Sequence, residues 1–516
     1  MADDSSTSDA VPLSDDTSTA TMAREGSIAF GGNVIKKVFG FAIVAVITRL
    51  VSPSVYGLFI LATSIILFVQ AFANLGLPEA IDYFVPQHLS DGEYGKARGV
   101  LVTVTGVVLV SSTVVAGLVV LSADLIADAF DEPSLRAALW LLSATVPFLA
   151  IYNALLGSFS AIKRLKFRVY MRDVIRPTVR LVTTAALLLL GYGLLGVVGG
   201  YLVGVVVAIS AGLVMLWRNA RYVFEADAVR ADPRPLLSYS VPLAFAGIIY
   251  IFLGQIDYFV IGYFLESEEV GIYRVGYALA ANLMIFSGSL GPIFKPLIAE
   301  AKEDTPAVRT RYQIVTRWIA GLTLPVAITI ALGASAYLSV VFTPQYAVAA
   351  AAVVILAGAN LISASCGGPD GTLLQGLGYS RLVFVNTALL LGINVAVSVL
   401  LVPRIGITGA AIGTASALTA NALAAVLEAY HFRGVQPLTV ELGKVLLSAV
   451  PAALAGGAVV LVIESVYVVA VALPPVVFVV YGVMLYLTDA FTEDDAEIAT
   501  QISPAARRAI RTVRRR

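Results

Sequence analysis

The sequence predicts an all-α polytopic membrane protein with about fourteen membrane-spanning helices, arranged as two six-helix lobes plus two C-terminal helices. Composition is the first observation behind this prediction. Of the 516 residues, 59% are hydrophobic and only 13% are charged, and the mean hydropathy is +0.88. Soluble domains are roughly 25% charged and cannot bury so much apolar surface. The second observation is an alternation of basic residues between loops, and the third is an internal repeat.

Apolar runs of spanning length follow one another along the chain, since a helix needs about 20 mostly apolar residues to cross a membrane. The connections between the runs are short, which leaves no room for a soluble domain between helices. The 177–192 run is the shortest of them. The predicted spans are 27–51, 57–83, 99–121, 135–160, 177–192, 194–217, 240–265, 272–298, 313–341, 347–375, 381–403, 405–430, 442–464 and 466–489.

The two ends of the chain differ in composition from the spans. Residues 1–26 are rich in Ser, Thr and Asp, which predicts a disordered acidic tail. They lack the basic start and apolar core of a signal peptide, and Met22 is an alternative start to Met1. Residues 490–516 form a basic tail that ends in RRAIRTVRRR. Beside a last helix, such a tail favours anionic lipid headgroups over nucleic acid as its partner.

Cysteine and histidine are too scarce for a disulfide or a metal site. The single cysteine, Cys366, excludes an internal disulfide. The two histidines, His88 and His431, lie far apart, which argues against zinc. We therefore expect no catalytic residues, no metal and no cofactor, apart from a coupling Na⁺ or H⁺ that Asp257 is suited to bind.

Lysine and arginine indicate which side of the membrane each loop faces. With the amino terminus inside, most of the 34 basic residues lie in the termini or in even-numbered loops. The densest group is Lys163, Arg164, Lys166, Arg168, Arg172 and Arg176, whereas the opposite face has Arg49, Arg136, Arg274 and Arg404. This asymmetry predicts a multi-pass protein of the cell membrane with both termini in the cytoplasm, and it requires an even number of spans.

Two pairs of motifs recur at nearly the same separation, which indicates a duplicated six-helix unit. GLLGVVGG from Gly193 and GITGAAIG from Gly406 share three glycines at an offset of 213 positions. SPSVYGLF from Ser52 and ESEEVGIY from Glu266 share a glycine and an aromatic residue at an offset of 214. Six helices end on the side where they began, so the copies share one orientation around a pseudo-two-fold axis along the membrane normal. The predicted divisions are an N-lobe (27–217), a cytoplasmic linker (218–239), a C-lobe (240–430) and two further helices in 431–489.

Several segments resemble polysaccharide flippases of the MOP exporter superfamily, over about residues 27–435. They are RLVSPSVYGLFILATSI from Arg49, LGLPEAIDYFVP from Leu75, DYFVIGYFLESEEVGIYRVGYAL from Asp257, FTPQY from Phe342 and LLQGLGYSR from Leu373. The last two helices fit the usual fourteen-span version. The resemblance implies a transporter that moves lipid-linked oligosaccharide, carried on a polyprenyl or dolichyl phosphate or pyrophosphate, between membrane leaflets. Glycosyltransferases of the same pathway are then expected as partners.

Two other functions stay open. A multidrug/cation antiporter shares the fold of the same superfamily, but it would have a carboxylate-rich cavity in the first lobe, where this chain has lysines. A membrane glycosyltransferase or ligase acting on the same lipid would need a sizeable extramembrane loop with catalytic groups. The short loops of this chain argue against an enzyme.

Basic residues inside the predicted spans suit an anionic substrate. Lys36 and Lys37 lie about 14–15 Å into the first span, too deep for easy snorkelling. Asn33, Lys37 and Gly40 share one helical face, so we predict a cavity lining there. The alternative is a first span that begins late, with both lysines at the interface. Arg180 and Lys295 lie near cytoplasmic helix ends, where snorkelling competes with a lower-cavity role, and Arg49 is either an outer interfacial anchor or a cavity residue.

Asp257 is an intramembrane carboxylate, about 12 Å below the outer end of its helix. Such residues are rare and face an interior or a cavity. Three interpretations are open. Asp257 forms an ion pair across the cavity, with Lys36 or Lys37 as leading partners, or it binds a coupling H⁺ or Na⁺, or it makes local hydrogen bonds that hold helices together.

Overall fold

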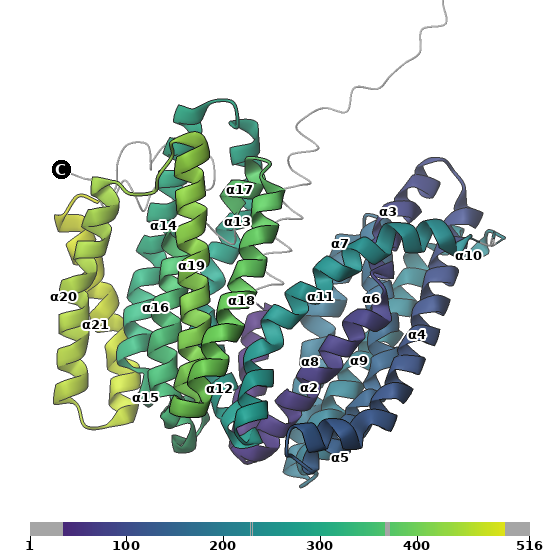
Figure 1. Ribbon diagram of the computed structural model, residues 1–516, viewed down its shortest axis with the longest axis horizontal. Coiled ribbons are helices and arrows are strands. Elements are labelled where there is room, and N and C mark those ends of the chain that lie inside the picture. The colour runs from purple at the N-terminus through teal and green to yellow at the C-terminus, as the bar shows by residue number, and fades with distance from the viewer. Residues whose placement is uncertain (1–34, 228, 230, 367–371, 491–516) are drawn as a thin grey trace, which may run out of the picture.

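The computed structural model describes residues 35–227, 229, 231–366 and 372–490, and within these residues every regular element is a helix (Figure 1). The N-lobe comprises a helix at 35–50, then α2 (Pro53–Asn74), α3 (Leu77–Ser90), α4 (Tyr94–Ala129), α5 (Ser134–Ser143), α6 (Thr145–Ala161), α7 (Leu165–Val169), the π-helix η1 (Tyr170–Ile175), α8 (Arg176–Leu189) and α9 (Gly193–Asn219). The short helix α10 (Arg221–Glu225) follows.

The C-lobe repeats this plan. It comprises α11 (Pro233–Phe264), α12 (Ser267–Ala280), η2 (Ala281–Met284), α13 (Ile285–Glu300), α14 (Thr305–Leu332), α15 (Ala334–Tyr337), η3 (Leu338–Phe342), η4 (Pro344–Ala349), α16 (Ala350–Cys366), α17 (Thr372–Gly376), α18 (Ser380–Ile405) and α19 (Ile407–Arg433). The last two helices, α20 (Val440–Val462) and α21 (Val466–Leu487), pack on each other and on α14.

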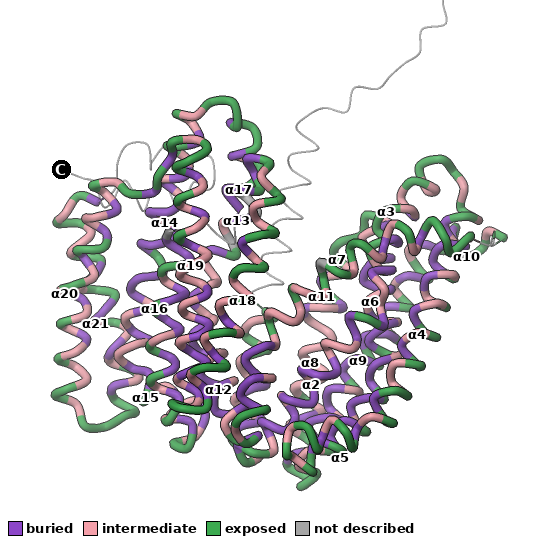
Figure 2. Tube along the Cα trace, viewed as in Figure 1, coloured by how far each residue is buried: buried purple, intermediate pink, exposed green. Residues whose placement is uncertain are grey.

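The all-helical membrane fold that we predicted is confirmed. Eleven described helices are long and apolar enough to cross a membrane, and α5 with α6, bent by 41°, would make a twelfth span. The predicted spans 27–51 and 177–192 correspond to the helix at 35–50 and to α8, which continues η1 and α7. A total of fourteen is consistent with these elements and stays a prediction. Large apolar side chains such as Leu121 and Leu461 are 82% and 87% exposed, as lipid contact requires. Exposed residues recur along the helices, α4 and α20 among them (Figure 2).

Figure 1 shows that the two lobes splay like a V. They meet where α2 packs against α12 and diverge toward the end that holds α3, α10 and α17. Helix α11 crosses between the lobes, because its first half packs on α3 and its second half on α2 and α18. If both termini are cytoplasmic as predicted, the V is open to the cytoplasm.

Helix boundaries depart from the predicted ones at the crossing. The span predicted at 57–83 is divided, since Leu75 and Gly76 adopt left-handed backbone conformations between α2 and α3. A Cβ on Gly76 would overlap the carbonyl oxygen of Ser240 on α11, so only glycine allows this close approach. Helix α11 begins at Pro233, inside the predicted linker 218–239, because Asp232 caps it and proline is compatible with the first turn.

The duplication is visible in equivalent helix contacts. Helix α8 packs on α9 in the N-lobe as α18 packs on α19 in the C-lobe. A Cβ on Gly200 of α9 would overlap the hydroxyl of Thr184, and a Cβ on Gly413 of α19 would overlap that of Ser398. Gly200 and Gly413 are separated by the repeat offset, and so are Thr184 and Ser398. The glycines therefore recur because they allow two helices to approach closely.

We expect Gly200→Ala to destabilise the protein, because the added methyl group also lies 2.7 Å from the backbone of Thr184 and the helices must separate. Overpacking of this kind costs about 1–3 kcal/mol. The melting temperature of the purified protein should fall, whereas Gly117→Ala on α4, where an added Cβ meets no atom within 4 Å, should leave it unchanged or raise it. Equal melting temperatures for the two variants would contradict this packing role.

The end at which the lobes meet is built from Pro53, Gly57, Ser267 and Gly271, and we call it the closed end. Added Cβ atoms on Gly57 and Gly271 would overlap the carbonyls of Ser267 and Pro53, so the two helices touch through their backbones. The hydroxyls of Ser54 and Ser267 lie 3.4 Å apart. Gly57 and Gly271 are equivalent positions of the repeat, so the pseudo-two-fold axis passes between them.

Candidate functional site

A series of basic side chains follows one stretch of the fifth span and reaches the other lobe. We call Lys36, Arg172, Arg176, Arg180 and Arg274 the basic band. Arg172, Arg176 and Arg180 recur every four residues along η1 and α8, which places them about 6 Å apart along the helix axis. The prediction that Arg172 and Arg176 lie in a cytoplasmic loop is wrong, because the helix begins at Leu165 and continues through the π-helical turn.

Tyrosine rings hold two guanidinium groups of the band. Arg176 lies 4.8 Å from the ring of Tyr152 and 5.3 Å from that of Tyr201. Arg180 lies 4.8 Å from the Tyr201 ring and 5.8 Å from the Phe59 ring. Aromatic faces stabilise cations without neutralising them. These two arginines therefore keep their full charge for an anionic ligand.

Arg172 is held differently. Its Nε and Nη2 donate to the two carboxylate oxygens of Asp173, at 2.8 and 2.9 Å, and Asp173 is fully buried. The neighbouring side chains share the π-helical turn, a local conformation that is frequent at functional sites. One carboxylate thus offsets one of the five positive charges of the band.

Arg274 brings the band to the C-lobe. We counted Arg274 on the outer face, near the start of the predicted span 272–298, and it lies within α12. Its Nη1 donates to the Tyr258 hydroxyl at 2.9 Å. The same guanidinium interacts with Tyr56 of α2 and with Arg180. Two like charges that interact disfavour each other's charged form, so an anionic ligand near them would be stabilising.

Lys36, and not Lys37, belongs to the basic band. The ammonium group of Lys36 interacts with Arg172, Asp173 and Arg176, whereas that of Lys37 interacts with Lys36. Asn33, which we predicted beside Lys37, lies outside the described residues. The spacing of Arg172, Arg176 and Arg180 in the sequence was the signal that could have predicted the band.

Arg49 and Lys295 lie away from the band. The Arg49 Nε donates to the Val341 carbonyl at 2.8 Å, and its Nη2 donates to the Val340 carbonyl, so this N-lobe residue binds the C-terminal carbonyls of η3 in the C-lobe near the closed end. Lys295 donates to Gln375 Oε1 at 3.1 Å and joins α13 to α17. Among the described residues, these hydrogen bonds of Arg49 and Lys295 involve no other member of the predicted site.

Asp257 lines a separate cavity of about 590 Å³, bounded by α11, α12, α16, α18 and α19, which we call the C-lobe cavity. It is 8% exposed. Its Oδ2 accepts hydrogen bonds from the Tyr273 hydroxyl and the Thr414 hydroxyl, both at 2.7 Å. Its Oδ1 accepts none from the described residues. The rest of the lining is a mixture of apolar side chains and uncharged polar groups, and the latter include Asn360, Asn386, Asn394 and Asn421.

The environment of Asp257 differs from the predicted pairing with Lys36 or Lys37. The ion pairs among the described residues do not include Asp257. Both lysines lie in the first helix of the N-lobe, whereas hydroxyl donors from α12 and α19 are adjacent to the carboxylate. The contacts match the third interpretation, in which Asp257 joins α11, α12 and α19 by local hydrogen bonds.

A family model described as polysaccharide biosynthesis protein matches residues 46–351, which is more than half of the chain. The chain belongs to the polysaccharide biosynthesis protein family. The matched region contains the basic band beyond Lys36, the closed end and Asp257. The family resemblance in the sequence is thereby confirmed.

Curated relatives and solved structures agree with this family. The chain is 23% identical over 433 residues to the probable low-salt glycan biosynthesis flippase Agl15 of Haloferax volcanii, covering 80% of this chain and 83% of the relative. The fold is similar to that of the lipid II flippase MurJ in an inward closed conformation, with a TM-score of 0.68 at 11% identity, over 89% of this chain and 98% of MurJ. It is also similar to an inward-facing multidrug resistance MATE transporter of the MOP superfamily, with a TM-score of 0.62 at 14% identity, over 77% and 94% of the two chains.

Proposed function

We propose that this polysaccharide biosynthesis family protein is a flippase, and not an enzyme, that translocates lipid-linked oligosaccharide on a polyprenyl or dolichyl phosphate carrier. The basic band between the lobes carries the proposal. A phosphate or pyrophosphate must leave water to cross the membrane, and fixed cations on a helix replace part of its hydration. Arg176 and Arg180 retain unneutralised charge on aromatic rings, and Arg274 extends that charge to the second lobe.

Alternating access through the space between the lobes is the proposed mechanism. The lobes meet at the closed end and diverge toward the end predicted to be cytoplasmic. Lipid-linked oligosaccharide assembled by glycosyltransferases on the inner leaflet would approach from that side. The relative named a probable glycan biosynthesis flippase supports this class of substrate. The predicted divisions at 27–217 and 240–430 would be the two moving units, joined by the linker between them, which includes the first turns of α11.

The decisive experiment reconstitutes the purified protein in vesicles that contain lipid-linked oligosaccharide with a fluorescent glycan. We expect a membrane-impermeant quencher to reach the whole glycan pool with the protein present and about half of it without. Vesicles loaded with a cationic dye test the antiporter alternative in parallel. Ion-driven extrusion of the dye with no redistribution of the glycan would contradict the flippase proposal and favour the antiporter.

Coupling to Na⁺ or H⁺ at Asp257 is the second part of the proposal. The carboxylate is buried, one oxygen has no described hydrogen-bond donor, and hydroxyl and amide oxygens surround it. Oxygen ligands suit hard cations, and an isolated buried carboxylate favours either a bound cation or a proton. Binding of a cation or proton at Asp257 would change its hydrogen bonds with α12 and α19, and could thereby shift these helices within the C-lobe.

We expect Asp257→Asn to abolish the response of transport to Na⁺ or pH gradients, because an amide neither titrates nor carries negative charge. Tyr273→Phe is the matched control, since it removes one hydrogen bond and leaves the carboxylate. The initial rate measured across Na⁺ concentrations and pH values should lose its dependence in the first variant only. An unchanged dependence in Asp257→Asn would restrict the residue to helix packing.

A further inference from the structure

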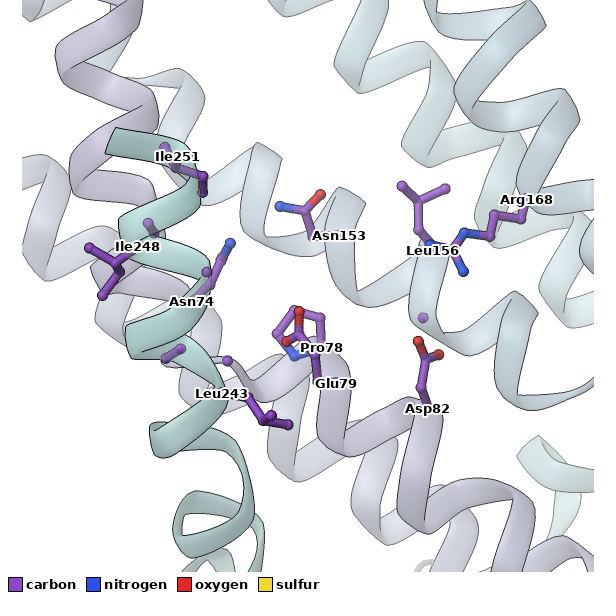
Figure 3. Close-up of a pocket in the computed structure, with 15 residues that line it drawn as sticks. Asn74, Pro78, Glu79, Asp82, Asn153, Leu156, Arg168, Leu243, Ile248 and Ile251 are labelled. Carbon is purple, nitrogen blue, oxygen red and sulfur yellow. The ribbon is translucent and has the colours of Figure 1, made fainter. Parts of the chain in front are cut away.

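A cavity of about 290 Å³ lies in the N-lobe, and its described lining residues include no member of the basic band or of the C-lobe cavity. It is bounded by the junction of α2 and α3, by α6 and α7, and by the first half of α11 (Figure 3). We call it the N-lobe cavity. Its volume equals that of about ten liquid water molecules, which suits one sugar ring and not an oligosaccharide.

Five polar side chains, Asn74, Glu79, Asp82, Asn153 and Arg168, converge on this cavity from four elements. In Figure 3, Asp82 and Arg168 point toward each other across the space, and Glu79 projects between Asn74 and Asn153. The side-chain Oδ1 of Asn74 accepts a hydrogen bond from Gln70 Nε2 at 2.9 Å, so the side-chain NH₂ of Asn74 remains available as a donor. Gln70 is 4% exposed, which holds this orientation.

The mixture of groups excludes simple ions as the ligand. Two carboxylates repel a phosphate or another anion. The guanidinium of Arg168 opposes a free cation, and no cluster of three or more acidic, His or Cys ligands occurs among the described residues. A sugar ring fits better, since each hydroxyl both donates and accepts. The carboxylates accept, Arg168 and Asn74 donate, and Asn153 does both.

The apolar part of the lining suits the same ligand. Leu156 of α6 and Ile248 and Ile251 of α11 are among its lining residues. A pyranose ring presents C–H groups on its faces and hydroxyls around its edge. Ligand sites commonly combine apolar walls with a few placed polar groups in this way.

The N-lobe cavity adjoins the basic band. Arg168 precedes Arg172 by four residues, which is about 6 Å along a helix. Asn153 follows Tyr152, whose ring lies beneath Arg176. We propose that the N-lobe cavity binds the carrier-proximal sugar of the lipid-linked glycan while the basic band binds its phosphate, an inference that rests on the proposed function. The cavity then selects carriers that have received a sugar over bare carrier phosphate.

The test compares two lipid probes, dolichyl phosphate and dolichyl phosphate glucose, by their affinity for the full-length protein in nanodiscs. Wild type should bind the glucosylated lipid more tightly. Asp82→Ala and Gly247→Leu should weaken that affinity by about tenfold and leave the affinity for dolichyl phosphate unchanged. An added Cβ at Gly247 meets no atom within 4 Å, so leucine fills the cavity without altering its charges.

Matched controls are Asp91→Ala, an exposed acid at the end of α3, and Gly117→Leu on α4. Neither should change the affinity for either lipid. Retained binding of dolichyl phosphate shows that a variant is folded. Equal weakening of both lipids in the cavity variants, or no weakening of either, would overturn the sugar site alone. Failure of the wild type to bind either lipid would overturn the proposed function and with it this inference.

Discussion

Oxidation of a Ser54→Cys/Ser267→Cys double variant, in a Cys366→Ala background, should reduce transport to the level of protein-free vesicles. The two hydroxyls lie 3.4 Å apart across the closed end, so the cysteines are within reach of a disulfide. Alternating access requires the lobes to separate there, and a covalent bond between α2 and α12 prevents it. Reduction should restore transport, and the glycan-quenching assay measures both states.

The matched control is Ser448→Cys/Thr488→Cys in the same background. These hydroxyls lie 3.3 Å apart, but both belong to the α20–α21 unit and not to opposite lobes. The oxidised control should transport normally. Normal transport by the oxidised Ser54→Cys/Ser267→Cys protein, with the cross-link verified by mobility in a gel, would mean that the closed end does not open during transport.

Arg176→Gln should lower the initial rate of glycan translocation by about 10- to 100-fold. A hydrogen bond to a charged group contributes about 1.5–3 kcal/mol, and each 1.4 kcal/mol is a tenfold change. Arg176 lies between the Tyr152 and Tyr201 rings, where its charge has no described carboxylate to neutralise it. The loss should be measured at equal protein abundance in the vesicles.

Arg136→Gln controls for the loss of an arginine that stacks on an aromatic ring. Arg136 lies 4.5 Å from the Trp140 ring and pairs with Asp124, on α5 and α4, outside the basic band. Its substitution should change the rate by less than about twofold, since exposed pairs contribute little. Similar rates for Arg176→Gln and wild type would contradict a phosphate-binding role for the band.

Local patterns in the sequence predicted what depends on local properties. Apolar length identified the spans, because every backbone group in lipid must bond within its own helix. Glycine spacing identified the repeat, and the contacts of Gly200 and Gly413 explain that spacing. Boundaries were less predictable where helices are divided, as at Leu75 and Gly76, since the close approach of α11 determines that break.

The sequence identified charged site residues by their own position, but it could not identify partners that are distant in the sequence. Lys36 was predicted to lie deep in the first span and Arg180 near the cytoplasmic end of its helix, and both belong to the basic band. Arg274 was counted only as an outer-face charge near the start of the predicted span 272–298, because charge alone cannot identify a residue that binds a tyrosine inside α12. Asp257 was found by its charge, but its partner Thr414 lies 157 positions away in the sequence.

The sequence by itself determined that the chain spans a membrane many times, and it predicted that its two halves are copies in one orientation and that cations lie inside the spans. These properties follow from composition and spacing, which need no knowledge of packing. Only the tertiary structure decided that Lys36 and not Lys37 joins the band, that Arg49 binds η3 across the lobes, and that Asp257 is held by hydroxyls. Each of these contacts requires a side chain or carbonyl group from another helix. The packing of the whole bundle determines which helix lies beside which, and local sequence does not.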